Sequence, residues 1–303
     1  MNNKLKQPQY LKTGDKIGIV STAGKIDKEY IDNAVNILSQ YGFEVVLGKN
    51  VLAANNMFAG IDEQRAFDFQ EMINDKSIKT IICSRGGYGT VRIIDKIEFS
   101  ALKKYPKWIC GYSDVTVLHS VINQIYGIET IHGTMPVSFS KTKSLGQLIE
   151  TLTGKITEYE IKSDALNITG SAEGILTGGN LSVLYSLRGT PYDIDTDGKI
   201  LFIEDLSEYF YHIDRMIMNL KIGGKLKNLK ALIVGGMSDM KEGNTLYGKT
   251  ANEIIQDAVK DYGYPVCFNF PAGHGDENFP LVMGRKMKVE VGRENVEVRF
   301  SKL

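Results

Sequence analysis

The sequence predicts an α/β protein with an N-terminal doubly wound, mostly parallel sheet domain and a smaller C-terminal α/β domain with a mixed sheet. Two observations support this prediction. Short apolar runs alternate with segments of helical periodicity, which is typical of parallel strands joined by helices. The length of 303 residues also fits two domains of roughly 150 residues each. We expect residues 1–140 to form the first domain, 141–172 a connection and 173–303 the second.

The first half reads as alternating strands and helices. Ile31, Val35 and Leu38 recur at helical spacing, and Gly42 ends that helix. The expected elements, in chain order, are a strand at 16–22, a helix at 27–41, a strand at 43–48, a helix at 62–74, a strand at 79–84, a helix at 90–97, a strand at 107–112 and a helix at 115–127.

The second half resumes the alternation after a segment at 138–172 that is rich in Ser, Thr and Lys. We interpret that segment as a surface turn, a helix and an irregular connection. The elements expected after it are a strand at 173–179, a helix at 180–189, a strand at 199–205, a helix to about 220, a strand at 230–236, a helix at 248–263, a strand at 266–270 and a hairpin at 287–300.

The charge balance argues against a nucleic-acid polymer as partner. Lys plus Arg number 36 and Asp plus Glu number 36, so the formal net charge is zero, and no block of five like charges occurs. The hydrophobic fraction of 43% excludes intrinsic disorder.

The cysteines and the N-terminus bear on the compartment. Cys83, Cys110 and Cys267 lie in apolar runs, so we expect buried reduced thiols rather than disulfides or a metal site. The N-terminus lacks the apolar region of a signal peptide, and no run of 18 apolar residues exists. We therefore expect a cytoplasmic protein without a membrane span.

The turn Gly111-Tyr112-Ser113-Asp114 is the strongest candidate for chemistry. A strand ends, a serine follows on a sharp turn, and a helix begins, as in a nucleophile elbow. The amide of Asp114 could then face an oxyanion. The match to G-x-S-x-G is partial, because Val115 replaces the second glycine. The alternative is that Ser113 or Asp114 only caps the helix.

A serine nucleophile needs a base and a carboxylate. Of the four histidines, His274 stands at a strand end between two glycines, which leave the backbone free to place an imidazole; the alternative is an incidental histidine in a turn. Glu204 and Asp205 end an apolar strand, where a carboxylate is costly unless paired. Asp205 could cap a helix, whereas Glu204 has no equally simple structural role.

The remaining histidines have simpler interpretations. We expect His119 to pack one turn into the helix after Ser113, while His132 follows an isoleucine in a short apolar segment and His212 lies within a helix. No H-E-x-x-H or C-x-x-C motif is present, so no metal is expected.

The turn Arg85-Gly86-Gly87-Tyr88-Gly89 follows another strand. Its glycines allow backbone amides to approach a ligand, either as an oxyanion donor facing Ser113 or as a phosphate cradle. The dinucleotide fingerprint is incomplete and no P-loop motif occurs, which weakens the nucleotide interpretation.

These segments together resemble the LD-carboxypeptidase family of serine peptidases, which includes the microcin-immunity amidases. The resemblance runs from about Leu11 to about Val291 and rests on LKTGDKIGIVSTAG, SRGGYGTVRIID, ICGYSDVTVLH, IHGTMP, LTGGNLSVLYSLRGTPYDID, ILFIEDLSEYFYHIDRMI and FPAGHG. One departure is Thr134 in IHGTMP, where proline is expected.

The resemblance implies a catalytic triad of Ser113, Glu204 and His274, an oxyanion hole from the Gly87 and Asp114 amides, a homodimer and no cofactor. Ser113 would attack the carbonyl, His274 would shuttle the proton, and water would release the acyl group. Because Ser113 lies in the first half and its partners in the second, we expect neither half to work alone.

The resemblance leaves three functions open. The first is hydrolysis of the L,D-bond to the terminal D-alanine of murein tetrapeptides, in peptidoglycan recycling. The second is an amidase that inactivates peptidyl-nucleotide antibiotics. The third is a non-catalytic small-ligand-binding protein. The spacing of 91 positions between Ser113 and Glu204 is more similar to that of the muropeptide branch than to that of the microcin branch.

A carboxypeptidase must also hold the free carboxylate of its peptide substrate. Arg85 and Arg215 are the candidates, with ordinary salt bridges as the alternative for each.

Overall fold

The computed structural model describes residues 6–155 and 158–301, which divide into two compact units. The first unit is Met1–Ile156 with Phe279–Gly284, and the second is Thr157–Asn278 with Arg285–Leu303. No helix within these described ranges has the length and apolar character needed to cross a membrane.

The first unit is built on a six-stranded sheet in the order β11-β5-β4-β3-β1-β2. All neighbouring strands are parallel except β11, which pairs antiparallel with β5. The strands are β1 (Lys16–Val20), β2 (Glu44–Leu47), β3 (Ile78–Cys83), β4 (Trp108–Gly111), β5 (Thr130–His132) and β11 (Leu281–Met283). The mostly parallel sheet predicted from the strand–helix alternation is confirmed.

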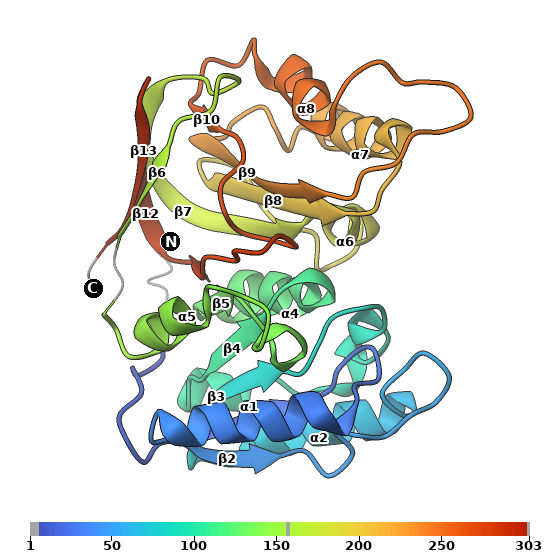
Figure 1. Cartoon of the computed structure of the whole chain (residues 1–303), viewed down its shortest axis with the longest axis vertical. Helices are drawn as coiled ribbons and strands as arrows, with labels where there is room; N and C mark the ends of the chain where they lie inside the picture. The colour runs from blue at the N-terminus through green and yellow to red at the C-terminus, as the bar shows by residue number, and fades with distance from the viewer. Residues whose placement is uncertain (1–5, 156–157, 302–303) are drawn as a thin grey trace. The chain divides into compact units, whose positions relative to one another are not determined.

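Helices α1 to α4 lie between these strands in the sequence, and α5 follows β5 (Figure 1). They are α1 (Lys28–Gln40), α2 (Asp62–Asn74), α3 (Ala101–Lys104), α4 (Thr116–Val121) and α5 (Leu145–Leu152), and α4 continues as a π-helical turn at Ile122–Tyr126. The helix α1 buries Ile31 and Leu38, as helical spacing predicts, together with Ala34, whereas Val35 is half-buried.

The prediction of a helix at 90–97 is wrong. The segment forms two 3-10 turns, Thr90–Arg92 and Ile94–Lys96, whose amides bond three residues back. The first amide, Thr90 N–H, donates to the Asp114 carboxylate at 2.8 Å. A contact across 24 positions therefore fixes the start of this segment, which local periodicity does not reveal.

The second unit has a seven-stranded mixed sheet in the order β10-β9-β8-β7-β12-β13-β6. The strands are β6 (Glu158–Lys162), β7 (Gly170–Asn180), β8 (Ile200–Leu206), β9 (Ala231–Ser238), β10 (Val266–Cys267), β12 (Lys286–Val291) and β13 (Asn295–Phe300). From β7 to β10 the strands are parallel, whereas β12, β13 and β6 are antiparallel. The long strand β7 joins these two parts, and the predicted hairpin is β12–β13.

The helices of the second unit are α6 (Leu181–Ser186), α7 (Phe210–Ile222) and α8 (Ala251–Val259). They share an apolar core with β8 and β9, and Figure 1 shows α7 and α8 beside these strands. Thr250 and Glu253 cap α8 reciprocally, which fixes where this helix begins.

The structure differs from the expected boundaries in two places. The segment 141–172 is not a separate connection, because it holds α5 of the first unit and β6 of the second. The segment Phe279–Gly284 returns to the first unit, since its strand β11 pairs with β5. The places of β6 and β11 arise from strand pairing between residues far apart in the sequence, with β13 and β5 respectively.

Candidate active site

Ser113 lies on a strained turn directly after β4. Its φ is +62°, a left-handed conformation that non-glycine residues rarely adopt. A 3-10 turn over Ser113–Val115 then leads into α4. Neither Ser113 nor Asp114 caps this helix through its side chain, so the capping alternative does not describe the turn. The geometry is that of a nucleophile elbow, which projects a hydroxyl away from the backbone.

The glycine-rich turn packs directly against Ser113. A β-carbon added at Gly86 would lie 2.8 Å from Ser113 Cβ and 3.0 Å from Ser113 Oγ. The same β-carbon would lie 3.5 Å from the amide nitrogen of Asp114. Only glycine therefore fits at position 86, and the turn brings backbone close to both Ser113 and the Asp114 amide. Gly87 follows with a φ of +111°.

Buried polar contacts hold this turn in place. Arg65 is 1% exposed and donates to the carbonyl oxygens of Thr22 and Gly89 at 2.7 and 2.9 Å. Asp114 is 3% exposed, and its carboxylate accepts the Thr90 amide at 2.8 Å. Burial raises the pKa of Asp114, opposed by its hydrogen bonds to Thr90. Sequence reasoning missed Arg65, because a charged residue inside an amphipathic helix gives no local sign of burial.

His119 and His132 belong to the interior of the first unit. His119 Nε2 donates to the Gly111 carbonyl at 2.9 Å, and burial lowers the pKa of His119 to about 4. The ring therefore stays neutral near pH 7 and supports the end of β4, in line with the expected packing role. His132 is buried on β5, with its ring centroid 6.4 Å from that of His119.

Glu204 and His274 meet in the second unit. Glu204 lies near the end of β8 and is fully buried, and its Oε2 accepts a hydrogen bond from His274 Nδ1 at 2.7 Å. Burial lowers the pKa of His274, but the Glu204 charge and hydrogen bond outweigh it, so the net shift is upward. The other carboxylate oxygen, Oε1, is buried without a hydrogen-bond partner among the described residues. The imidazole is thus the main compensation for a costly buried charge.

Two glycines make room for this pair. A β-carbon at Gly273, which has a φ of +120°, would lie 2.8 Å from Glu204 Oε2. One at Gly235 on β9 would lie 3.2 Å from Glu204 Cβ and 2.4 Å from the Ala272 carbonyl. The Gly273 amide also donates to Asn278 Oδ1 at 2.9 Å, which orients the loop that carries His274.

Asp205 caps a helix, as the alternative interpretation of this residue predicted. The helix that it caps is α6, and not the helix that follows its own strand. Its oxygens accept from the Ser182 amide at 2.9 Å, at the start of α6, and from Asn180 Nδ2 at 3.1 Å. Burial and the adjacent Glu204 charge raise the pKa of Asp205 to about 7. Asn180 itself caps α6 by accepting the Val183 amide.

The two candidate arginines have other partners. Arg85 is partly buried, and its guanidinium donates to the Lys25 carbonyl at 2.9 Å. Arg215 is exposed on α7, with its guanidinium carbon 5.3 Å from the centre of the Tyr211 ring. Neither arginine forms an ion pair within residues 6–155 and 158–301, so the salt-bridge alternative describes neither of them.

The structure assigns the other sequence features to structural roles. His212 Nδ1 lies 2.5 Å from Oε2 of Glu208, four positions earlier in the sequence. The three cysteines are buried, and burial raises the pKa of Cys83 to about 12. Among the described residues, no group of three or more His, Cys, Asp and Glu side chains could hold a metal ion.

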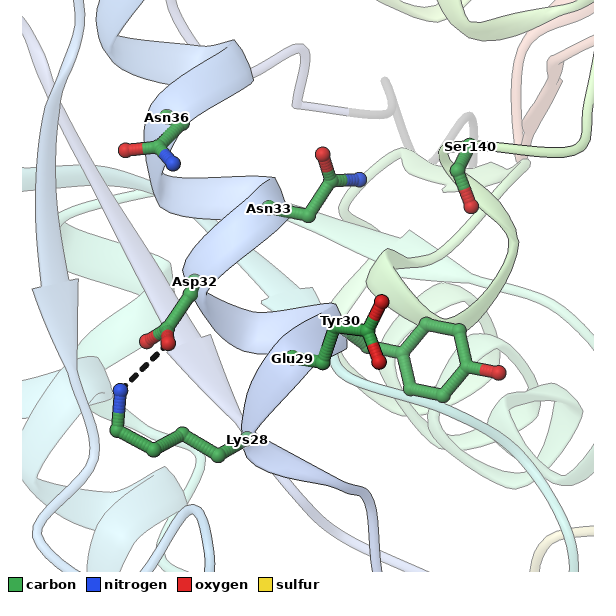
Figure 2. A pocket seen from close by; sticks show the side chains of 7 residues that line it. All are labelled: Lys28, Glu29, Tyr30, Asp32, Asn33, Asn36 and Ser140. Carbon is green, nitrogen blue, oxygen red and sulfur yellow. Dashed lines mark hydrogen bonds and ion pairs between the residues drawn. The ribbon is translucent and has the colours of Figure 1, made fainter.

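A cavity along α1 contains none of the predicted site residues. Its volume is about 520 Å³, and Figure 2 shows the side chains that line it, from Lys28 to Asn36 on the helix and Ser140 opposite. Lys28 and Asp32 form an ion pair at 2.5 Å across two of its lining positions. Its charged lining residues are of mixed sign, one lysine and two carboxylates.

Comparison with known proteins identifies the family to which this chain belongs. The model described as the LD-carboxypeptidase N-terminal domain matches residues 17–133, and that described as the LD-carboxypeptidase C-terminal domain matches residues 173–289. A probable murein peptide carboxypeptidase of Bacillus subtilis is 35% identical over 299 residues, covering 96% of this chain and 94% of that protein.

Solved structures agree with this assignment. The muramoyltetrapeptide carboxypeptidase of Oxalobacter formigenes has a TM-score of 0.85 and 28% identity, covering 95% of this chain and 99% of that one. MccF in complex with glutamyl sulfamoyl guanosine has a TM-score of 0.87 over 99% of both chains, and at 22% identity it shares the fold. The chain belongs to the LD-carboxypeptidase family.

Proposed function

We propose that this protein is a serine-type LD-carboxypeptidase that hydrolyses the L,D-peptide bond to the terminal D-alanine of murein tetrapeptides. The hydrogen bond between Glu204 and His274 is the observation that carries the chemistry, because it supplies an oriented base. The relatives named murein peptide and muramoyltetrapeptide carboxypeptidase supply the substrate class.

The proposed triad is Ser113, His274 and Glu204. With Nδ1–H donated to Glu204, Nε2 is the ring nitrogen that accepts the Ser113 proton and later passes it to the leaving amine. Ser113 Oγ bonds to the carbonyl carbon of the L-residue, the C–N bond to D-alanine breaks, and water then hydrolyses the acyl-enzyme. Ser113 comes from one unit and its partners from the other, so we expect neither unit to be active alone.

The oxyanion would be held by the amides of Gly87 and Asp114. The support for this assignment is the close packing of the glycine-rich turn against Ser113 and the Asp114 amide. Each such donor is worth about 3 kcal/mol of the activation barrier. Arg85 and Arg215 remain our candidates for the substrate carboxylate.

A paired assay tests the substrate class. Purified protein is incubated with murein tetrapeptide and, separately, with an aminoacyl-sulfamoyl adenosine, and D-alanine and the free amino acid are quantified. We expect D-alanine release from the tetrapeptide and much slower cleavage of the adenosine compound. Preference for the adenosine compound would assign the microcin-type amidase instead, and inactivity on both would favour a binding protein.

We also propose a homodimer. The support is three exposed apolar side chains on one face of α7, Tyr211, Met218 and Ile222, which are 48%, 38% and 81% exposed; the exposed Arg215 packs beside Tyr211 on the same face. Light scattering is expected to give twice the chain mass, and Ile222→Asp to lower it. A monomeric wild-type protein would contradict this.

We propose the cytoplasm as the compartment, in keeping with three buried free cysteines. Cell fractionation tests it.

A further inference from the structure

A basic cavity lies at the amino ends of β3 and β4 in the first unit. Its volume is about 310 Å³, which is within the range of small-molecule sites. Four lysines line it, Lys76, Lys79, Lys104 and Lys107, together with two glutamines and a tyrosine, and its lining includes no carboxylate. The charged side chains that line this cavity are therefore all positive.

Most of this positive charge is unpaired. Lys76, Lys79 and Lys104 make no ion pair with any residue in the described ranges 6–155 and 158–301. The neighbouring carboxylate of Asp75 accepts from the Ser77 amide and hydroxyl at 2.8 and 2.7 Å. Ammonium groups gathered around one cavity repel one another, and a bound anion would offset that repulsion.

Tyr105 brings two of the lysines together. The Lys76 and Lys104 nitrogens lie 5.0 and 5.5 Å from the centre of the Tyr105 ring. Both are within the range of a cation–π contact. Lys76, followed by Lys104, lowers the pKa of the Tyr105 hydroxyl. One aromatic ring thus holds two cationic groups at the rim of the cavity.

Lys107 contributes a buried ammonium group. The residue is 1% exposed, and its Nζ donates to the carbonyl oxygens of Asp75 and Ile78. An ammonium group has three donors, so one N–H remains beyond these two bonds. Burial lowers the pKa of Lys107 to about 8, opposed by the charge of the neighbouring Asp75 carboxylate, and an anion in the cavity would further favour the charged form of Lys107.

The cavity is separate from the proposed catalytic residues. Lys107 immediately precedes β4, whereas Ser113 follows the opposite, carboxyl end of the same strand. Substrates of open parallel sheets bind beyond the carboxyl ends of the strands. A ligand at the amino ends would therefore occupy a second site.

We propose that this cavity binds a small phosphate-bearing anion with two or more negative charges. Lysine binds phosphate as a point charge, and the four lysines of the lining match the several negative charges that a phosphate group concentrates on one small ligand. The glutamine amides of Gln7 and Gln9 add neutral donors to the wall.

Calorimetric titration with inorganic pyrophosphate at fixed ionic strength tests this proposal. The variant Lys76→Gln/Lys104→Gln removes two exposed charges from the rim, and Lys227→Gln/Lys230→Gln is a matched control, since both of its lysines are exposed in the second unit. We expect wild type and control to bind equally, and the rim variant to bind at least tenfold more weakly.

Citrate at the same ionic strength separates phosphate from carboxylate recognition, and we expect it to bind at least tenfold more weakly than pyrophosphate. Three results would overturn the proposal: no binding of pyrophosphate to the wild-type protein, equal losses in the rim variant and the control, or citrate binding as tightly as pyrophosphate. Thermal unfolding of each variant without ligand verifies that it is folded. The assay does not use peptidase activity, so its outcome is independent of the proposed function.

Discussion

The carboxylate of Glu204 accepts a hydrogen bond from His274 Nδ1 at 2.7 Å, although 70 positions separate the two residues in the sequence. The strand β8 supplies the buried carboxylate, and a glycine-flanked loop supplies the imidazole. This pair orients the ring and stabilises the imidazolium that forms when the base accepts a proton.

The pH dependence of catalysis should report this pair. His274 acts as a base only when neutral, so kcat/KM is expected to rise with pH with a midpoint above 6.5, the ordinary value. Glu204→Gln removes the charge that raises the pKa, so the midpoint should move to lower pH. The rate should also fall by about 10³–10⁴, because the glutamine amide favours the wrong tautomer. An unchanged midpoint in a pH–rate profile of this variant would argue against His274 as the base.

Gly273 should be essential for the geometry of the pair. In Gly273→Ala the new β-carbon would lie 2.8 Å from Glu204 Oε2 at a φ of +120°, so we expect kcat/KM to fall by about 10². Gly275→Ala is the control in the same loop, because its nearest contact would be at 3.7 Å and its φ is not positive. Steady-state kinetics of both variants decide the matter, and equal activities would contradict the prediction.

A second glycine should be essential beside Ser113. Gly86→Ala would place a β-carbon 2.8 Å from Ser113 Cβ and displace the glycine-rich turn, so kcat should fall by about 10²–10³ if that turn supplies an oxyanion donor. Gly146→Ala on α5 is the control, since nothing lies within 4 Å of its added carbon. Measured kcat values within twofold of each other would count against this role.

The backbone strain at Ser113 should lower the free energy of unfolding by a measurable amount. Its φ of +62° costs a non-glycine residue roughly 1–2 kcal/mol. We therefore expect Ser113→Gly to have a free energy of unfolding about 1 kcal/mol above that of Ser113→Ala, with both inactive. Urea denaturation compares them, and a glycine variant less stable than the alanine variant would show that the turn is unstrained.

The alternation of apolar runs and helical periods predicted most of the fold. The helix expected at 62–74 is α2, because its apolar spacing is local information. The strand β6 escaped prediction, since Glu158–Lys162 has charged residues on one side and gains its partner, β13, from the end of the chain. The strand β11 escaped for the same reason, as its partner β5 lies about 150 positions away.

The residues of the candidate site likewise divide into those that could be predicted from the sequence and those that could not. Ser113 and Glu204 could be selected because each stands close to a strand end, next to a tight turn or a costly burial, and His274 because two glycines flank it, although β10 ends earlier than expected, at Cys267. Arg65 and Asn278 could not, because their roles rest on hydrogen bonds with backbone groups, the Thr22 and Gly89 carbonyls for Arg65 and the Gly273 amide for Asn278, which no sequence motif marks. The proximity of Gly86 to Ser113 likewise depends on two strand ends lying side by side in the sheet.

The most direct test of the account is D-alanine release from murein tetrapeptide by wild type and by Ser113→Ala, each shown to be folded by its thermal unfolding. The account predicts steady release by the wild-type protein and a loss of at least about 10³-fold in the variant, because the nucleophile is removed while binding groups remain. Release by Ser113→Ala at more than a tenth of the wild-type rate would contradict the assignment of Ser113 as the nucleophile.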